Sequence, residues 1–353
     1  MNPMKQKLRV GIAIDLPDAD LELISEIEPR LDLVHEPGLY RPHRWNGDWE
    51  GDPDFTRTPA QNERYTRMLN SVDALFGIPD VNPALLSETV RANGDLRWVH
   101  TTAAGGGAQV KAAGLTAAEL ERVAFTTSAG VHGSTLAEFA LFGVLAGAKN
   151  LRKLQADQAQ KLWPAQRWRM RHLDEMTVLV VGLGGIGATV AERFKACGST
   201  VWGTSRSGKA VPGVDRLIDP SQLAQAAGKV DAIVATLPGT ASTEGLLGSE
   251  VFAAVRQGTI LVNVGRGTVV DEAALIPALD DGRIGFAALD VVAHEPLVAT
   301  SALWDHPSVL ISPHTAALSD QETSRIARLF AQNATCLLEG KLLRNRVDTV
   351  EFY

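Results

Sequence analysis

A glycine-rich turn with the spacing of a phosphate-binding loop lies near the middle of the chain. The segment 182–187 reads Gly-Leu-Gly-Gly-Ile-Gly, directly after an apolar run and directly before a helical pattern. The first glycine of such a turn permits a tight bend, the second lets backbone amides approach a pyrophosphate, and the third lets helix and strand pack closely. The alternative is a set of turn glycines in an unliganded α/β domain. We predict a dinucleotide site on a helix N-terminus, formed by Gly182, Gly184, Gly185, Ile186 and Gly187.

The end of the next predicted strand bears on which dinucleotide would bind. An NAD site has an acidic residue there, about 20 residues beyond the turn, which accepts hydrogen bonds from ribose hydroxyls. This chain has Ser205, Arg206 and Ser207 instead. A guanidinium is always charged and can bind phosphate through two parallel hydrogen bonds, and serine hydroxyls can donate more. We predict that NADP(H) is preferred; if Arg206 is only a solvated turn residue, NAD(H) can serve as well.

Three further polar segments follow predicted strands, at the edge where open α/β sheets bind ligands. They are Asn263 to Gly267, Asp290 to Pro296 and Ser312 to Ala316. Together with the glycine turn, they make the chain resemble the D-isomer-specific 2-hydroxyacid dehydrogenases, over the region from the helix-opening segment 130–138 through the C-terminal helix. The resemblance implies an enzyme that moves a hydride between NAD(P)H and a small 2-oxo or 2-hydroxy acid.

By this resemblance, the family's arginine, carboxylate and acid/base histidine fall on Arg266, Glu295 and His314. A 2-oxo acid has a carboxylate and a ketone on adjacent carbons, so Arg266 could orient the substrate and stabilise charge on the ketone oxygen. A protonated His314 could donate its proton to that oxygen, and Glu295 would favour the protonated ring. Taken singly, each residue also has an ordinary structural explanation as an ion-pair, surface or core residue.

The resemblance assigns further residues to substrate and cofactor. Main-chain amides of Ala104 and Gly105 would bind the substrate carboxylate, although this loop lacks the Asp or Asn that the family commonly has near Gly107. Ile78 would form a wall of the substrate pocket. The residues that would line the dinucleotide, the last of them approaching the nicotinamide carboxamide, are Leu237, Pro238, Thr243, Val264 and Asp290.

These residues need two sheets to position them. Short β-branched runs alternate with helical patterns, which predicts parallel strands. The expected strands are 8–14, 32–36, 72–78, 96–102 and 123–127, and then 177–184, 200–205, 230–238, 259–265, 286–291 and 309–313. The fold class is therefore α/β, with two doubly wound parallel-sheet domains that are Rossmann-like or flavodoxin-like. The resemblance implies an active-site cleft between a substrate domain of 1–129 plus 318–353 and a dinucleotide domain of 130–317.

Two helical patterns and one irregular stretch complete the expected organisation. A long helix is predicted in the tail, ending near Gly340. The apolar tract 136–148 predicts a helix that the resemblance places in a homodimer interface; burial within its own domain is the alternative. The stretch 40–59 is rich in Pro, Gly, Asp, Trp and Arg and fits no element. Such long loops are usually functional lids or disordered insertions.

Composition excludes several classes of protein. At 353 residues and 45% hydrophobic, the chain can bury a large core. Its net charge of −7 argues against a protein that coats nucleic acid or an anionic membrane. The apolar tracts are too short for a signal peptide or a spanning helix, and Cys197 and Cys336 have no metal-ligand or redox spacing. We expect a cytoplasmic protein without a metal.

Two other functions on a related fold remain to be separated from this one. A formate dehydrogenase needs no proton on a carbonyl oxygen, and those relatives have Gln where this chain has Glu295. A cofactor-sensing corepressor could retain all three catalytic residues. Turnover with 2-oxo acids would discriminate between these alternatives.

Overall fold

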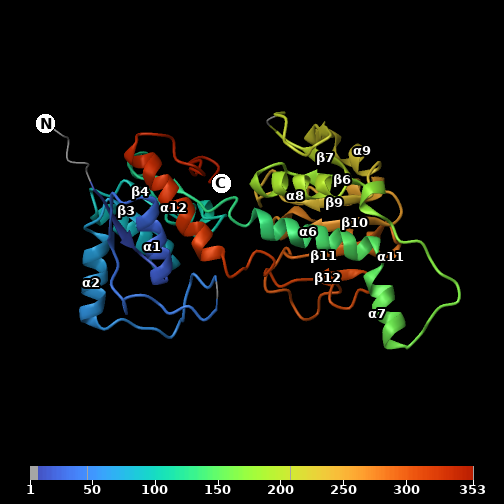
Figure 1. The fold of residues 1–353 in the computed structure, drawn as a ribbon, viewed down its shortest axis with the longest axis horizontal. Coiled ribbons are helices and arrows are strands. Elements are labelled where there is room, and N and C mark those ends of the chain that lie inside the picture. The colour runs from blue at the N-terminus through green and yellow to red at the C-terminus, as the bar shows by residue number, and fades with distance from the viewer. Residues whose placement is uncertain (1–6, 46, 207, 353) are drawn as a thin grey trace. The chain divides into compact units, whose positions relative to one another are not determined.

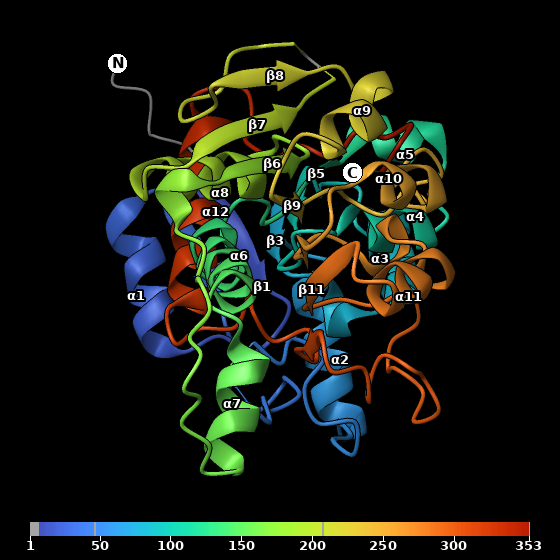
Figure 2. The same cartoon turned by 90° about the vertical axis from the view of Figure 1, so that its right-hand side faces the viewer.

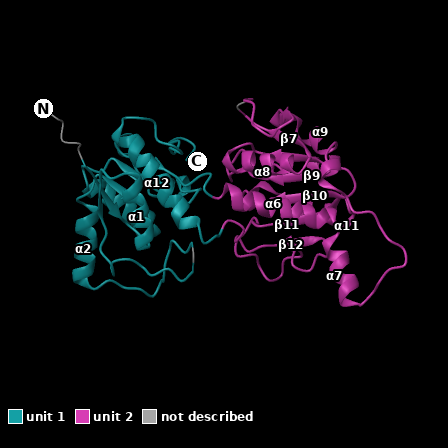
Figure 3. Cartoon of the chain, in the orientation of Figure 1, with its two compact units in different colours: residues 1–131, 318–353 teal, residues 132–317 magenta. Residues whose placement is uncertain are grey.

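The computed structural model describes residues 7–45, 47–206 and 208–352. It has two compact units: unit 1 comprises residues 1–131 and 318–353, and unit 2 comprises residues 132–317 (Figure 3). Each unit contains one sheet, of five strands in unit 1 and seven in unit 2, and the paired strands of both sheets are parallel (Figure 1). The predicted class, α/β with two parallel-sheet domains, is confirmed.

The sheet of unit 1 has the strand order β2-β1-β3-β4-β5. Its strands are β1 (Leu8–Ile12), β2 (Leu31–Val34), β3 (Ala74–Phe76), β4 (Trp98–His100) and β5 (Ala124–Thr126). The helices of this unit are α1 (Asp18–Ile27), α2 (Pro59–Leu69), α3 (Pro83–Ala92), α4 (Gly107–Ala112), α5 (Ala117–Arg122) and α12 (Glu322–Leu338), with a short 3-10 helix at Pro79–Val81.

Two apolar clusters cover the faces of this sheet. Helices α1 and α12 lie side by side on one face, although they come from opposite ends of the chain (Figure 1). The other cluster joins residues of α2, α3 and α4 to the strands. On the first face, the ring of Phe330 in α12 stacks on Trp98 of β4, with 4.6 Å between ring centroids. The predicted C-terminal helix therefore completes the core of unit 1.

The described residues of the stretch 40–59 form no helix or strand before Pro59, yet they pack within unit 1. Asp48 is 4% exposed and pairs with Arg44 at 2.7 Å. The indole N–H of Trp49 donates to Oε1 of Glu322 in α12, at 3.3 Å. Arg57 pairs with Asp80, which follows β3. Side-chain hydrogen bonds and ion pairs, rather than backbone ladders, hold the described residues of this segment.

The sheet of unit 2 has the strand order β12-β11-β10-β9-β6-β7-β8. Its strands are β6 (Thr177–Val181), β7 (Thr200–Thr204), β8 (Arg216–Ile218), β9 (Ala232–Ala235), β10 (Thr259–Asn263), β11 (Ile284–Leu289) and β12 (Val309–Ile311). Strand β8 was not predicted, because its sequence, Arg-Leu-Ile, has only two apolar residues and stands between Asp215 and Asp219. The chain moves outward from β6 to β8 and then resumes at β9, on the other side of β6. The sheet therefore has its topological switch point between β6 and β9, where such sheets bind ligands at the carboxyl ends of the strands.

Helices cover both faces of this second sheet. The helices of unit 2 are α6 (Gly133–Ala148), α7 (Leu151–Ala159), α8 (Gly185–Ala196), α9 (Leu223–Ala227), α10 (Ser249–Ala254) and α11 (Glu272–Asp280), with 3-10 turns at Leu173–Glu175, Pro220–Gln222 and Gly267–Val269. Helices α6 and α8 pack on one face and α9, α10 and α11 on the other (Figure 2). Helix α7 projects away from the sheet of unit 2 in both views (Figures 1 and 2). Among the described residues, no helix is long and apolar enough to span a membrane.

Candidate active site

The glycine turn connects β6 to α8 and has the geometry of a phosphate-binding loop. Gly182 has φ +102°, a left-handed conformation that favours glycine, and its N–H donates to Oγ1 of Thr204 at 3.0 Å. A Cβ on Gly187 would lie 1.9 Å from the carbonyl oxygen of Gly182, so only glycine fits there. A Cβ on Gly184 would have no atom within 4 Å. The backbone at Gly184 and Gly185 is thus open to a ligand, at the N-terminus of a twelve-residue helix.

The neighbouring strand β7 ends beside this turn, because Val181 and Thr204 are register partners. Ser205 is half-buried and Arg206 is exposed directly after Thr204, while Ser207 lies outside the described residues. A hydroxyl and a guanidinium therefore follow the strand at the position where an NAD site would carry an acid. This is the arrangement expected for a phosphate on the adenosine ribose.

The loops after β9 and β10 lie against the glycine turn. A Cβ on Gly182 would meet the Leu237 side chain at 2.6 Å, and one on Gly265 would meet the Leu237 carbonyl oxygen at 2.6 Å. The hydroxyl of Thr243 donates to the carbonyl oxygen of Pro238 at 2.6 Å and closes the loop after β9. Val264 is buried. The predicted cofactor residues of these two loops therefore lie together, at the carboxyl ends of the strands of unit 2.

Arg266 stands on a tight loop that directly follows β10. The buried side chain of Asn263 accepts from the N–H of Gly265 and donates to the carbonyl oxygen of Arg266, both at 3.0 Å. A Cβ on Gly267 would lie 1.9 Å from the carbonyl of Val292, so the loop packs directly on the backbone after β11. These contacts fix the backbone of Arg266, whereas within the described part of the chain its guanidinium bonds only to the adjacent carbonyl of Gly265, at 2.8 Å.

His314 follows β12 in a left-handed conformation, with φ 56°. The buried carboxylate of Asp290 holds the loop in this shape: its Oδ1 accepts hydrogen bonds from the hydroxyl of Ser312 at 2.7 Å and from the N–H groups of Thr315 and Ala316 at 3.0 Å. The N–H of His314 also donates to the carbonyl oxygen of Asp290 at 2.9 Å. Asp290 thereby compensates a backbone conformation that is uncommon for residues other than glycine.

The imidazole of His314 meets the carboxylate of Glu295. Nδ1 of the ring lies 2.7 Å from Oε2 of Glu295, and Oε1 of the same carboxylate accepts from the N–H of Val292 at 3.2 Å. Within the described residues, Nε2 of His314 has no hydrogen-bond partner, and the side chain is 46% exposed. With Nδ1 engaged, Nε2 is the atom that can exchange a proton with a bound molecule.

In unit 1, the loop between β4 and α4 offers backbone amides. Neither the N–H of Ala104 nor that of Gly105 donates to an acceptor in the part of the chain that the structure describes. Ile78, by contrast, is 2% exposed and packs in the apolar core of the unit. The side chain of Ile78 therefore packs inside unit 1, and its place in the wall of a substrate pocket stays a prediction.

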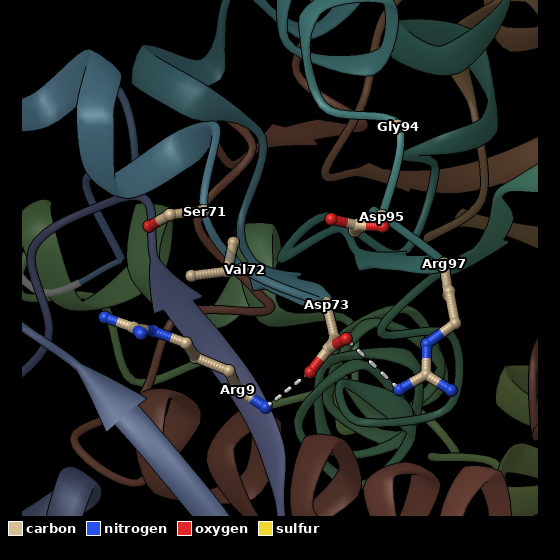
Figure 4. A pocket seen from close by; sticks show the side chains of 7 residues that line it. All are labelled: Arg9, Ser71, Val72, Asp73, Gly94, Asp95 and Arg97. Atoms are coloured by element: carbon tan, nitrogen blue, oxygen red, sulfur yellow. Dashed lines mark hydrogen bonds and ion pairs between the residues drawn. The ribbon is translucent and has the colours of Figure 1, made fainter.

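A cavity of about 500 Å³ opens elsewhere in unit 1, at the amino ends of its strands. It is lined by Arg9, Ser71, Val72, Asp73, Gly94, Asp95 and Arg97 (Figure 4). Asp73 accepts from the N–H of Arg9 at 2.9 Å and pairs with Arg97 at 3.4 Å. Because the cavity lies at the ends of the strands opposite to the Ala104 loop, and because both of its arginines are paired with carboxylates, we do not assign it to the substrate.

The comparisons with known proteins agree with this geometry. Residues 141–316 match the model of the family "D-isomer specific 2-hydroxyacid dehydrogenase, NAD binding domain". A glyoxylate/hydroxypyruvate reductase A from Salmonella paratyphi B is 34% identical over 223 residues, which are 63% of this chain and 70% of that protein. The chain belongs to the D-isomer specific 2-hydroxyacid dehydrogenase family.

Solved structures of this dehydrogenase family have the same fold over nearly the whole chain. The enzyme from Xanthobacter autotrophicus Py2, in complex with NADPH and MES, is 28% identical, covers 99% of this chain and 100% of its own, and has a TM-score of 0.76. A family protein from Aeromonas salmonicida is 26% identical, covers 98% and 99%, and has a TM-score of 0.74.

In this family member, three polar residues hold the site together in roles that were not predicted from the sequence. Asn263 and Ser312 were named only as parts of the segments that contain Arg266 and His314. Asp290 was predicted to approach the nicotinamide carboxamide, and its Oδ1 also holds the His314 loop. A polar residue that ends a buried strand was the available signal, because it needs an internal hydrogen-bond partner. Among the described residues, no cluster of metal ligands occurs.

Proposed function

We propose that this protein is a reductase that uses NADPH to convert a small 2-oxo acid into the D-2-hydroxy acid, with glyoxylate and hydroxypyruvate as the first substrates to test. The observation that carries the proposal is the His314–Glu295 pair. Nε2 of His314 has no hydrogen-bond partner among the described residues, and it lies at the carboxyl ends of the same strands as Arg266 and the glycine turn. The name of the Salmonella relative supports the choice of substrates.

The residues of unit 2 fit a dinucleotide with an extra phosphate. The open backbone at Gly184 leaves room for a pyrophosphate, and Ser205 and Arg206 can bond to a 2′-phosphate. NADPH in the Xanthobacter relative supports this preference, with NADH as the weaker cofactor. When bound, the nicotinamide supplies the hydride. We therefore assign 130–317 to the dinucleotide and 1–129 plus 318–353 to the substrate.

Each catalytic side chain would act on one part of the substrate. Arg266, on its rigid backbone loop, orients the acid and stabilises negative charge on the ketone oxygen. The protonated Nε2 of His314 donates to that oxygen, while Glu295 keeps the ring oriented and favours its protonated form. In unit 1, the unused N–H groups of Ala104 and Gly105 bind the substrate carboxylate.

An activity panel tests this proposal directly. The purified protein is assayed with glyoxylate, hydroxypyruvate, pyruvate, phenylpyruvate and formate, each with the appropriate form of both cofactors. We expect turnover with glyoxylate and hydroxypyruvate, and a higher kcat/KM with NADPH than with NADH. Absence of turnover with every 2-oxo acid would favour a corepressor-like protein, and oxidation of formate would favour a formate dehydrogenase relative.

We also propose that the protein is a homodimer through α6. One side of this helix is closed within unit 2, since a Cβ on Gly143 would lie 2.8 Å from that of Ala288. Phe142, next to Phe139 on this helix, is 46% exposed. Light scattering coupled to size exclusion should give a dimer mass, and Phe142→Glu should shift it toward the monomer. A monomeric unmutated protein would contradict the proposal.

A further inference from the structure

A chain of hydrogen bonds inside unit 1 leads from the aromatic core to the loop that carries Ala104. The indole N–H of Trp98 donates to Oγ1 of Thr126 at 2.8 Å, and the same Oγ1 lies 2.8 Å from Nδ1 of His100. Nε2 of His100 lies 3.2 Å from Oγ of Ser128, whose hydroxyl donates to the carbonyl oxygen of Thr101 at 3.0 Å. Trp98, His100, Thr126 and Ser128 are buried, so water does not compete with these bonds.

The groups at the two ends of this series of hydrogen bonds determine which atom donates and which accepts in each bond. An indole N–H can only donate and a carbonyl can only accept, and each hydroxyl has a single proton. The proton of Ser128 is used on the Thr101 carbonyl, so Ser128 must accept from Nε2–H of His100. Nδ1 of His100 then accepts from the hydroxyl of Thr126, which in turn accepts from Trp98. Burial lowers the pKa of His100 to about 3, which keeps this neutral tautomer throughout the neutral range.

Ser128 also controls the next peptide of the loop. Its N–H donates to the carbonyl oxygen of Ala103 at 3.4 Å, and the same carbonyl accepts from the hydroxyl of Thr101 at 3.1 Å and from the N–H of Gly106 at 3.2 Å. A trans peptide is planar, with its C=O and N–H pointing in opposite directions. Fixing the Ala103 carbonyl inward therefore turns the N–H of Ala104 outward, where it has no acceptor among the described residues.

We propose that His100 and Ser128 are positioning residues, which orient the N–H of Ala104 toward the carboxylate of the substrate. The inference rests on the proposed function, because that function assigns the Ala104 amide to the carboxylate. His100 does not touch the substrate. It holds the hydroxyl of Ser128 in the orientation that anchors Thr101, and Ser128 is the last link before the loop. Substrate binding, rather than proton transfer, is the step that these residues serve.

Because Nε2 of His100 is the donor to Ser128, two substitutions of His100 can be compared as a matched pair. The amide nitrogen of glutamine can take the place of Nε2, whereas asparagine reaches only that of Nδ1. His100→Gln should therefore keep the bond to Ser128, and His100→Asn should lose it, as should Ser128→Ala. We expect His100→Asn and Ser128→Ala to raise KM for the 2-oxo acid about fivefold, the effect of one ordinary hydrogen bond, with kcat and NADPH affinity within about twofold. His100→Gln should stay closer to the unmutated KM.

A structural control separates positioning from general destabilisation. Asn93 is buried at the other edge of the same sheet, and its side-chain amide donates to the carbonyls of Leu69 and Val72, both at 2.9 Å. Asn93→Ala should lower Tm and leave KM unchanged. A KM that rises equally in Asn93→Ala and Ser128→Ala, or that rises in neither Ser128→Ala nor His100→Asn, overturns the positioning role while the proposed function stands. Lack of turnover in the unmutated protein overturns both.

Discussion

Nδ1 of His314 lies 2.7 Å from Oε2 of Glu295, and the two side chains remain 46% and 38% exposed. Exposed ion pairs contribute little to folding, with typical values below about 1 kcal/mol. The contact is therefore better understood through its effect on the ring, whose Nε2 it directs away from the carboxylate. Glu295 itself accepts a hydrogen bond from the N–H of Val292, so the loop after β11 determines the orientation of the ring.

Replacing Glu295 by glutamine should weaken the proton donor. The amide keeps the size of the side chain but removes the negative charge that lies 2.7 Å from Nδ1 of His314. The ring would lose its ionic partner and the acceptor that orients it, so proton donation from Nε2 should slow. We expect kcat for reduction to fall while NADPH affinity is preserved. An unchanged kcat would show that Glu295 is not the functional partner of His314.

Removal of His314 and removal of Arg266 should have different kinetic signatures. His314→Ala should lower kcat by about 10²–10⁴-fold, as expected for a lost general acid, with a smaller change in KM. Arg266→Ala should raise KM and lower kcat together, and Arg266→Lys should restore only part, since an ammonium lacks the two-pronged geometry. NADPH titration without substrate controls for folding. Full turnover in His314→Ala, or loss of NADPH binding in Arg266→Ala alone, contradicts these roles.

Arg206 should determine the cofactor preference. It follows β7 next to the glycine turn, where no acid is present to bind ribose hydroxyls. Arg206→Ala should raise KM for NADPH and leave KM for NADH nearly unchanged, because only the former has a 2′-phosphate. The measurement is kcat/KM with both cofactors. Equal efficiency with NADPH and NADH in the unmutated enzyme would refute the predicted preference.

Two glycines of the same turn should separate folding from cofactor binding. Gly184→Ala adds a methyl group where no atom lies within 4 Å, at a site open to the pyrophosphate, so Tm should be kept while NADPH affinity falls. Gly187→Ala places the methyl group 1.9 Å from a backbone oxygen and should lower Tm as well. Thermal unfolding and fluorescence titration measure the two effects. If both variants lose Tm equally, the turn is not open at Gly184.

The buried His100 predicts how stability depends on pH. Burial lowers its pKa to about 3 from an ordinary value near 6.5, so between these values the unfolded chain binds a proton that the folded chain does not. The free energy of unfolding should therefore fall as pH decreases below about 6.5, by up to about 1.4 kcal/mol per pH unit. His100→Gln should remove this component. Denaturant unfolding of both proteins at pH 6.5 and 5 gives the difference, about 2 kcal/mol; equal losses would show that His100 is protonated in the folded state.

The sequence by itself determined the residue types of the site and the elements that carry them. Glycine spacing, an arginine in place of an acid after β7, and polar segments after β10, β11 and β12 are local features, since each depends on one strand and its adjoining turn. Parallel strands meet at one edge, so the gathering of these segments could also be predicted. The resemblance to known dehydrogenases extended this to the expected roles of Arg266, Glu295 and His314.

Only the tertiary structure decided how these residues are held. That Asp290 fixes the His314 loop, that Ile78 turns into the core, and that Ser128 and Ala103 meet across two loops all depend on contacts between distant segments. Sequence periodicity indicates which face of an element is buried, but the hydrogen-bond partner of a buried polar atom is determined only when folding brings distant segments together. The order of the 40–59 stretch has the same origin, because its ion pairs and its bond to α12 join residues far apart in the chain.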